Sequence, residues 1–242
     1  MQFINLAGYR FVALDGLDAR KAAFREKCAN LALKGTVLLS PEGINLFAAG
    51  SEDSCAAFVE FVRADPSFAD LRFKRSVSSF LPFDRMLVKI KKEIITLRSP
   101  GPDPATQRAA EVSAAELKGW LDEGRDVVLI DARNEFEVAA GSFKDAIDLK
   151  LKSFGEFPAA VDRLDPALKD KTIVTFCTGG IRCEKAAPVM TGKGFKNVFQ
   201  LEGGILQYFE DCGDAHFAGR CFVFDHRVEL DGNLATAVTG AR

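Results

Sequence analysis

The residues best suited to chemistry in this sequence surround one cysteine. After an apolar run, the chain reads Cys177-Thr178-Gly179-Gly180-Ile181-Arg182 and then enters a helix-like segment. Backbone N–H groups from Thr178 to Arg182, together with the helix N-terminus, can stabilise a thiolate. The planar guanidinium of Arg182 adds a positive charge suited to an oxyanion. This pattern predicts a nucleophilic Cys177, whereas the alternative is a buried cysteine that merely ends a strand.

A second thiol follows closely in the sequence. Cys183 lies six positions after Cys177, in the first turn of the expected helix. It could resolve a sulfenic acid or a persulfide formed on Cys177. It could equally pack as an apolar side chain, and the sequence leaves both interpretations open.

Four further residues are potential zinc ligands near the C-terminus, namely Cys212, His216, Cys221 and His226. Their spacings of three, four and four intervening residues match no common structural zinc pattern. The sequence also contains no Walker loop, no dinucleotide fingerprint and no recognisable flavin, haem or two-histidine iron motif. We therefore predict no metal site and no evident cofactor.

Short apolar strands that alternate with helices must position the cysteine loop. The predicted buried strands are Val127–Ile130, Ile173–Phe176 and Asn197–Leu201. A capping box formed by Ser113 and Glu116 opens one helix, and a second helix is predicted over 182–191, where Pro188 should shorten or kink it. This alternation is typical of an α/β domain with a parallel sheet.

The first hundred residues follow a different order. Strands are predicted at Asn5–Val12, Thr36–Leu39, Asn45–Ala49 and Leu71–Ser76, and helices at Leu17–Leu33 and from the N-cap Ser51 to Arg63. The resulting βαββαβ order predicts a ferredoxin-like α+β domain. An extended segment at Met86–Leu97 and three prolines between Pro100 and Pro104 follow it. We expect an α+β domain at 1–98, a linker at 99–108, an α/β domain at 109–212 and a C-terminal extension at 213–242.

Composition limits the remaining classes. The chain has 242 residues, of which 48% are hydrophobic, and its formal net charge is -2. These values are typical of a folded globular protein and exclude extensive disorder. No apolar run approaches the length of a membrane span, no signal peptide is recognisable, and the six cysteines include no C-x-x-C pair. We therefore expect a cytoplasmic protein with reduced thiols and no membrane partner.

One segment is strongly basic within this net-negative chain. Between Arg72 and Arg98 there are eight lysines or arginines against two acidic residues. An alternating strand would point Lys89 and Lys91 to one face and Lys92 to the other. Phosphate contacts by these lysines would suit an RNA partner, and the alternative is a solvated strand face. Arg10 and the turn from Glu42 to Asn45 are the other candidates for an RNA surface.

The C-x-x-G-x-R loop resembles the active-site loop of the rhodanese sulfurtransferases. Asp131, Arg133 and Glu137 resemble the largely structural D-x-R-x-x-x-E element of that fold, and Gln200–Ile205 resembles its late strand and glycine turn. Four residues separate Cys177 from Arg182, which favours sulfur chemistry over the larger loop of the rhodanese-like phosphatases. The resemblance implies a rhodanese domain at 109–212.

Five motifs in the same order extend the resemblance to the whole chain. They are Tyr9–Val12, Gly35–Asn45, Val88–Ile94, Cys177–Lys185 and Cys221–Asp225 with Arg227 and Val228. This set is similar to that of the rhodanese-domain tRNA uridine hydroxylases, which make 5-hydroxyuridine at the wobble position in an oxygen-dependent reaction. The resemblance implies an oxidoreductase that takes O2 as co-substrate, the tRNA anticodon arm as partner and Cys177 as the essential residue. It implies no particular electron donor. The alternatives are a sulfurtransferase that carries a persulfide on Cys177 and a noncatalytic RNA-binding module.

Overall fold

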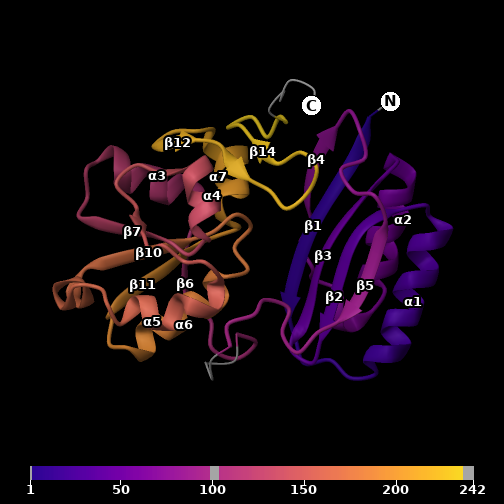
Figure 1. Ribbon diagram of the computed structural model, residues 1–242, viewed down its shortest axis with the longest axis horizontal. Helices are drawn as coiled ribbons and strands as arrows, with labels where there is room; N and C mark the ends of the chain where they lie inside the picture. Colours follow the sequence, from indigo (N-terminus) through magenta and orange to yellow (C-terminus); the bar gives the residue numbers. More distant parts are fainter. Residues whose placement is uncertain (1, 99–103, 237–242) are drawn as a thin grey trace. The chain divides into compact units, whose positions relative to one another are not determined.

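The computed structural model of the protein describes residues 2–98 and 104–236 (Figure 1). The chain divides into two compact units between Thr96 and Leu97. Residues 99–103, the first half of the predicted linker at 99–108, lie outside the described residues. Among the described residues, no helix is both long and apolar enough to cross a membrane.

The N-terminal unit is built on a mixed sheet. Its strands are β1 (Phe3–Phe11), β2 (Lys34–Ser40), β3 (Gly43–Gly50), β4 (Lys74–Ser78) and β5 (Met86–Ile90). The strands lie in the order β4-β1-β3-β2-β5, and the first four pair antiparallel. This confirms the predicted ferredoxin-like arrangement. Strand β5 adds to it by pairing parallel with β2 at one edge.

Two helices of this unit cover one face of the sheet (Figure 1). They are α1 (Leu17–Asn30) and α2 (Glu52–Arg63), and a single turn, η1 (Pro66–Phe68), follows. Helix α1 packs against β2 and β5, and α2 packs against β1 and β3. Their inward side chains, such as Phe24 and Phe58, join Val37, Leu39 and Leu46 of the strands in one core. As predicted, the Ser51 hydroxyl caps α2, accepting a hydrogen bond from the backbone N–H of Ser54.

Three predicted boundaries in this unit are corrected. Helix α1 ends at Asn30 rather than at residue 33, and Ala32 then adopts a positive φ of 52°. Strand β4 begins at Lys74 rather than Leu71, because the residues between the end of η1 and Lys74 form an irregular connection. Strand β5 ends at Ile90, so the alternation predicted as far as Leu97 is wrong beyond that residue.

The C-terminal unit contains the predicted parallel sheet. Its strands are β6 (Ala110–Val112), β7 (Val127–Asp131), β9 (Ile147–Asp148), β10 (Thr172–Phe176) and β11 (Asn197–Leu201). They lie in the order β6-β11-β10-β7-β9, and every neighbouring pair is parallel. Strand β10 is therefore the middle strand, and its residues from Ile173 to Phe176 are fully buried.

Helices connect these strands. They are α3 (Ala114–Asp122), α4 (Glu135–Ala140), α5 (Phe157–Val161), α6 (Cys183–Gly192) and α7 (Gly204–Cys212), with single turns η2 (Phe154–Glu156) and η3 (Pro166–Asp170). The predicted capping box of Ser113 and Glu116 is present at the start of α3. Pro188 does not shorten the helix that contains it, because α6 extends through this residue to Gly192.

The residues after α7 belong to the core of the C-terminal unit. Strand β12 (Phe217–Gly219) pairs with β8 (Gly141–Phe143), and β13 (Cys221–Phe222) pairs with β14 (Glu229–Leu230). Phe217 and Cys221 are buried in the same cluster as Phe143. The segment predicted as an extension therefore contributes packing to this unit as far as it is described.

Candidate active site

The cysteine loop lies at the carboxyl end of the middle strand of the parallel sheet. Cys177 directly follows β10, and α6 begins six residues later at Cys183. Ligands of parallel α/β sheets bind at this edge, where strand ends and helix N-termini meet. Thr178, Gly179 and Ile181 are partly exposed, whereas Gly180 and Arg182 are buried. The structure thus brings all the predicted loop residues together around one sulfur atom.

The environment of Cys177 favours a thiolate. Burial alone would raise the pKa of this thiol, but a hydrogen bond from the Cys183 thiol, the charge of Arg182 and the backbone N–H groups of Arg182 and Gly180 lower it to about 6. The Gly180 nitrogen lies 3.2 Å from the Cys177 sulfur. Since the ordinary value is 9.0, the thiolate becomes the major form at neutral pH.

Cys183 is the protonated partner of this pair. Its side chain is fully buried, and burial together with its contact with Cys177 raises its pKa well above the ordinary value. Cys183 therefore keeps its proton and donates it in a hydrogen bond to the Cys177 sulfur. The contact between the two thiols is compatible with both roles left open by the sequence.

A glycine turn supports the loop from the side. Gly204, the first residue of α7, has a φ of 67°, and a Cβ atom there would lie 2.4 Å from the Cys177 carbonyl oxygen. The following residues donate backbone hydrogen bonds to the loop, from Ile205 to the Cys177 carbonyl (2.9 Å) and from Leu206 to the Thr178 carbonyl (3.0 Å). The glycine turn that resembles the rhodanese motif thus holds the cysteine loop in place.

Arg182 has a partner that the sequence did not reveal. Its Nη1 lies 2.8 Å from Oε2 of Glu137, and its Nη2 lies 3.1 Å from Oε1 of the same carboxylate. The guanidinium carbon also lies 5.7 Å from the centre of the Phe224 ring. The planar fork expected to bind an oxyanion is therefore held by Glu137, while the positive charge still acts on Cys177. The D-x-R-x-x-x-E spacing was the only sequence signal for this pairing.

A second buried ion pair fixes the neighbouring strand end. Arg133 Nη2 lies 2.6 Å from Oδ2 of Asp131 and donates to the Gly141 carbonyl oxygen at 2.6 Å. Both charged side chains are completely buried. Together they tie the end of β7 to β8, which agrees with the structural role implied by the resemblance.

The four potential zinc ligands do not meet. His216 Nε2 lies 2.7 Å from Oδ1 of Asp122, and Cys221 is buried in the core, where desolvation raises its pKa to about 12. Over residues 2–98 and 104–236, no group of three or more His, Cys, Asp or Glu side chains is arranged to hold a metal ion.

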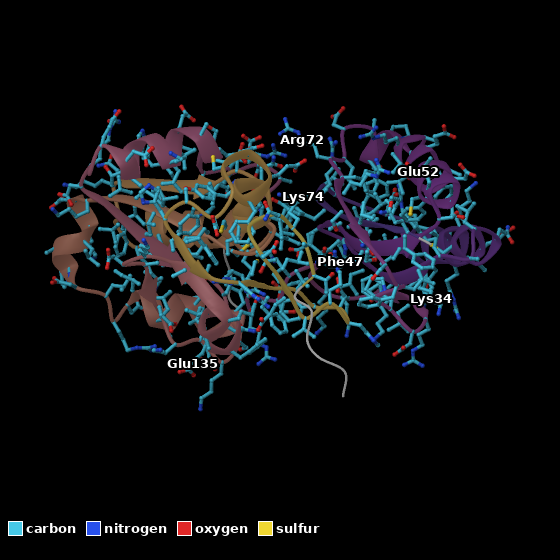
Figure 2. All side chains as sticks on the ribbon, turned by 90° about the horizontal axis from the view of Figure 1, so that it is seen from above. Lys34, Phe47, Glu52, Arg72, Lys74 and Glu135 are labelled. Carbon is cyan, nitrogen blue, oxygen red and sulfur yellow. The ribbon has the colours of Figure 1, made fainter. Side chains whose placement is uncertain are left out.

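The predicted RNA-binding lysines lie on the N-terminal unit. Strand register places Lys89 beside Leu38, Asn45 and Tyr9 on the face opposite the helices. In the next row on that face, Ala7 is flanked by Lys74 and Phe47, whose ring is 37% exposed (Figure 2). An exposed aromatic ring between basic side chains suits contact with single-stranded nucleic acid.

The other candidates for the RNA surface have different surroundings. Lys91 and Lys92 are both exposed and lie beyond the end of β5 at Ile90, so the strand alternation predicted for them does not extend that far. Arg10 lies on the helix-covered face, where its guanidinium pairs with Asp70 at 3.1 Å. The structure therefore does not bring Arg10 together with Lys89.

The turn between β2 and β3 clamps the chain that follows β5. Glu42 Oε1 accepts a hydrogen bond from the backbone N–H of Ile94 at 2.7 Å, and Asn45 Nδ2 donates to the Ile94 carbonyl at 3.3 Å. These contacts show that Glu42 and Asn45 hold the basic segment against the sheet.

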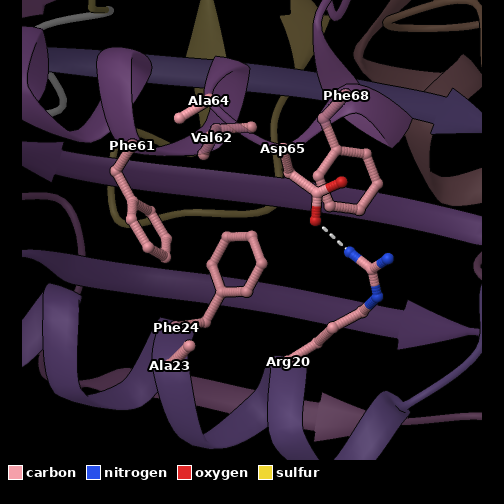
Figure 3. A pocket seen from close by; sticks show the side chains of 8 residues that line it. All are labelled: Arg20, Ala23, Phe24, Phe61, Val62, Ala64, Asp65 and Phe68. Atoms are coloured by element: carbon pink, nitrogen blue, oxygen red, sulfur yellow. Dashed lines mark hydrogen bonds and ion pairs between the residues drawn. The ribbon is translucent and has the colours of Figure 1, made fainter.

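A separate cavity of about 270 Å³ opens between α1 and the end of α2 (Figure 3). It is lined mainly by apolar side chains, including Phe24, Phe61 and Phe68. Arg20 and Asp65 form an ion pair at its rim. None of the predicted site residues lines this cavity, so we do not assign the chemistry to it.

Comparison with known proteins agrees with both units. A family described as the UPF0176 acylphosphatase like domain matches residues 3–94, and the Rhodanese-like domain matches residues 113–211. A crystal structure of a rhodanese-related protein from Thermoplasma volcanium is 24% identical, with a TM-score of 0.36, and covers 43% of this chain and 93% of that chain. The two family matches, together with the fold and the loop, define a rhodanese-domain protein with an acylphosphatase-like N-terminal domain.

Two relatives identify the family. The tRNA uridine(34) hydroxylase of Burkholderia mallei (strain NCTC 10229) is 51% identical over 97% of this chain and 82% of its own length. That of Cupriavidus necator (strain ATCC 17699) is 51% identical over 98% of this chain and 86% of its own length. The chain therefore belongs to the tRNA uridine(34) hydroxylase family.

Proposed function

We propose that this protein hydroxylates the wobble uridine of tRNA to 5-hydroxyuridine, with Cys177 as the essential residue. The observation that carries this proposal is the thiol at the end of β10, whose pKa is lowered to about 6 inside a rhodanese loop. The 51% identity to tRNA uridine(34) hydroxylases supports the substrate. A tRNA substrate also supports the expected cytoplasmic location.

The proposed reaction is a monooxygenase-type oxidation. One atom of O2 enters the C5–H bond of uracil, the other leaves as water, and an external two-electron donor supplies the electrons. The Cys177 thiolate adds to C6, which breaks the C5–C6 double bond and moves its electron pair to C5. After C5 is hydroxylated, loss of the C5 proton and departure of the sulfur restore the double bond. This role requires a thiolate, which the loop stabilises.

The N-terminal unit is the proposed holder of the anticodon arm. Lys89 and Phe47 share the sheet face opposite the helices, and Lys91 and Lys92 follow at the exposed end of β5. Phosphates would meet the lysines, and unpaired bases of the loop would stack on the exposed ring. Arg10 is a weaker candidate, because it lies on the other face of the sheet and forms an ion pair with Asp70. We assign 1–98 to this domain, 109–212 to the rhodanese domain and 213–242 to an extension of it.

Mass spectrometry of tRNA nucleosides tests the proposal. Cells that lack this gene should lose 5-hydroxyuridine and its derivatives, and the wild-type gene should restore them. The purified protein should form 5-hydroxyuridine in unmodified tRNA only when O2 and a reductant are supplied. Unchanged nucleosides in the deletion strain would refute the assignment.

One observation keeps sulfur transfer as a second candidate. Four residues separate Cys177 from Arg182, as in rhodanese loops that carry a persulfide. Incubation with thiosulfate and a thiol acceptor distinguishes the two functions. Rapid sulfur transfer without tRNA, together with no hydroxylation, would favour the second candidate.

A further inference from the structure

Three phenylalanines gather on the C-terminal unit although they come from two distant segments. Phe136 lies in the first turn of α4, Phe222 lies in β13, and Phe224 follows two residues later. The ring centre of Phe222 lies 5.2 Å from the ring centre of Phe136 and 5.2 Å from that of Phe224. Each of the three pairs of rings meets edge to face. Phe136 is 50% exposed and Phe224 is 57% exposed. Two large aromatic side chains therefore stand in solvent beside each other.

This cluster borders the cysteine loop through Arg182. The guanidinium of Arg182 lies over the Phe224 ring, and it is paired with Glu137, the residue next to Phe136. The same Arg182 lowers the pKa of Cys177. The charge of Arg182 therefore acts on the thiolate while its guanidinium lies over the exposed ring, so the aromatic cluster adjoins the reactive loop.

The backbone around Phe224 is held firmly. Asp225 and Arg227 form a buried pair in which Arg227 Nε lies 2.8 Å from Oδ1 and Nη2 lies 2.5 Å from Oδ2. The backbone N–H of Arg227 donates to the same carboxylate at 2.9 Å, and Val223 N–H donates to the Val228 carbonyl at 2.8 Å. This tight turn explains the Cys221–Val228 motif, because it fixes Phe224 outward without giving the ring a core partner.

We propose that Phe136, Phe222 and Phe224 form an aromatic platform on which an unpaired nucleobase of the substrate RNA stacks next to Cys177. This inference rests on the proposed function. A base must leave its stack to reach a buried sulfur, and enzymes that modify bases recover that cost through stacking on aromatic rings. The contact through Arg182 makes the platform continuous with the reactive loop, and the fixed turn reduces the cost of ordering it.

The test uses the full-length protein and a synthetic anticodon stem-loop. Phe224→Leu keeps an apolar side chain but removes the aromatic face, and Phe224→Tyr keeps that face. We expect Phe224→Leu to weaken stem-loop binding by about 5- to 150-fold, the range measured for loss of one stacked base. Phe224→Tyr should bind within about twofold of wild type. Equal binding by wild type and Phe224→Leu would overturn the platform.

A second variant gives a direct signal of stacking. Phe224→Trp should show a change in tryptophan fluorescence when the stem-loop binds, and a stem-loop with an abasic site at the stacked position should abolish that change. Abasic sites at the target uridine and at each neighbour then identify the base. A fluorescence signal that no abasic substitution alters would contradict the proposal.

The outcomes also separate this inference from the function on which it rests. If the wild type hydroxylates tRNA while Phe224→Leu binds and reacts normally, only the platform is wrong. If the wild type neither binds the stem-loop nor hydroxylates tRNA, the proposed function fails and the platform fails with it. The thiolate titration of Cys177 in Phe224→Leu should keep its midpoint near pH 6, which shows that the loop itself is intact.

Discussion

Cys177 and Cys28 are both buried thiols, yet their surroundings give them opposite properties. Cys28 lies near the C-terminal end of α1 in the N-terminal core, and burial raises its pKa to about 11. Cys177 lies just before the N-terminal end of α6, and its pKa is lowered to about 6. Burial therefore does not create a reactive cysteine here. The low pKa of Cys177 comes instead from the hydrogen bonds that the backbone N–H groups and the Cys183 thiol donate to the sulfur, and from the nearby charge of Arg182.

The buried arginines of the C-terminal unit extend this comparison. Arg133 is fully enclosed and bound to Asp131 and to backbone carbonyls, so it serves the fold. Arg182 is bound on one side to Glu137 but also acts on Cys177 and covers Phe224. The difference is that Arg182, although paired with a carboxylate, still acts on a reactive group, whereas Arg133 does not.

The largest expected effect comes from replacing the sulfur of Cys177 by oxygen, with the same replacement at Cys28 as the comparison. Cys177→Ser should reduce tRNA hydroxylation to background, because a serine hydroxyl does not ionise at neutral pH. Cys28→Ser should keep the wild-type rate per folded molecule while losing about 1–2 kcal/mol of stability, since a hydroxyl is buried in an apolar core. Product analysis and chemical denaturation measure the two effects. Hydroxylation by Cys177→Ser would remove this residue from the mechanism.

The support of the loop can be broken without touching the sulfur. Gly204→Ala places a Cβ atom 2.4 Å from the Cys177 carbonyl oxygen at a positive φ, so we expect a loss of about 3 kcal/mol or more and a marked loss of activity. Gly119→Ala is the matched control, because nothing lies within 4 Å of its added Cβ in α3. This control should gain about 0.5–1 kcal/mol. Thermal unfolding and activity assays compare them, and equal behaviour would show that the glycine turn does not support the loop.

Arg182→Lys tests whether charge alone is enough. An ammonium group keeps the positive charge but cannot hold both oxygens of Glu137 in a planar fork. We expect a substantial fall in the hydroxylation rate with a preserved fold by circular dichroism. A near-normal rate would reduce Arg182 to a source of charge.

Replacing the second thiol, Cys183, should change the pH at which Cys177 ionises. Cys183→Ala removes a hydrogen-bond donor to the Cys177 sulfur, so the pKa of Cys177 should rise above its value of about 6. Thiolate absorbance should then appear at higher pH, and activity near pH 7 should fall but recover as the pH rises. Cys183→Ser retains a donor and should titrate close to wild type. An unchanged midpoint in Cys183→Ala would mean that the backbone N–H groups and Arg182 suffice.

The smallest effect is expected on the N-terminal unit. Lys89→Ala combined with Lys91→Ala should weaken tRNA binding and reduce the slope of log affinity against log salt by about 1 to 2, because fewer counterions are released. Stability should barely change, since exposed lysines contribute little to folding. Lys21→Ala combined with Arg25→Ala removes the same charge from α1 and should leave the slope unchanged. Identical slopes in all three proteins would place the RNA surface elsewhere.

Local patterns in the sequence were sufficient to predict much of the fold. The apolar runs predicted β7, β10 and β11, and the N-caps at Ser51 and Ser113 predicted where α2 and α3 begin. These features depend on neighbouring residues along the chain. Brief strands such as β9, with two residues, carry too little pattern to be predicted.

The features that the sequence did not reveal depend on contacts between distant segments. Glu42 accepts a hydrogen bond from Ile94, 52 positions away in the sequence, and Glu137 binds Arg182 across 45 positions. Phe136 and Phe224 are likewise far apart until α4 and β13 pack together. Neither propensity nor spacing contains this information, so the loop cysteine could be predicted but its carboxylate and aromatic neighbours could not.

Strand β5 also decides how the N-terminal sheet ends. In the order β4-β1-β3-β2-β5, it covers the backbone of β2 and leaves its own outer edge at the border. Bare strand edges can recruit the edge of another chain, and lysines placed there oppose such joining through repulsion. Lys89 on the strand and Lys91 just beyond it are exposed lysines of this kind. We therefore expect the side chains proposed to bind RNA phosphates to oppose edge-to-edge association of the protein when no RNA is bound.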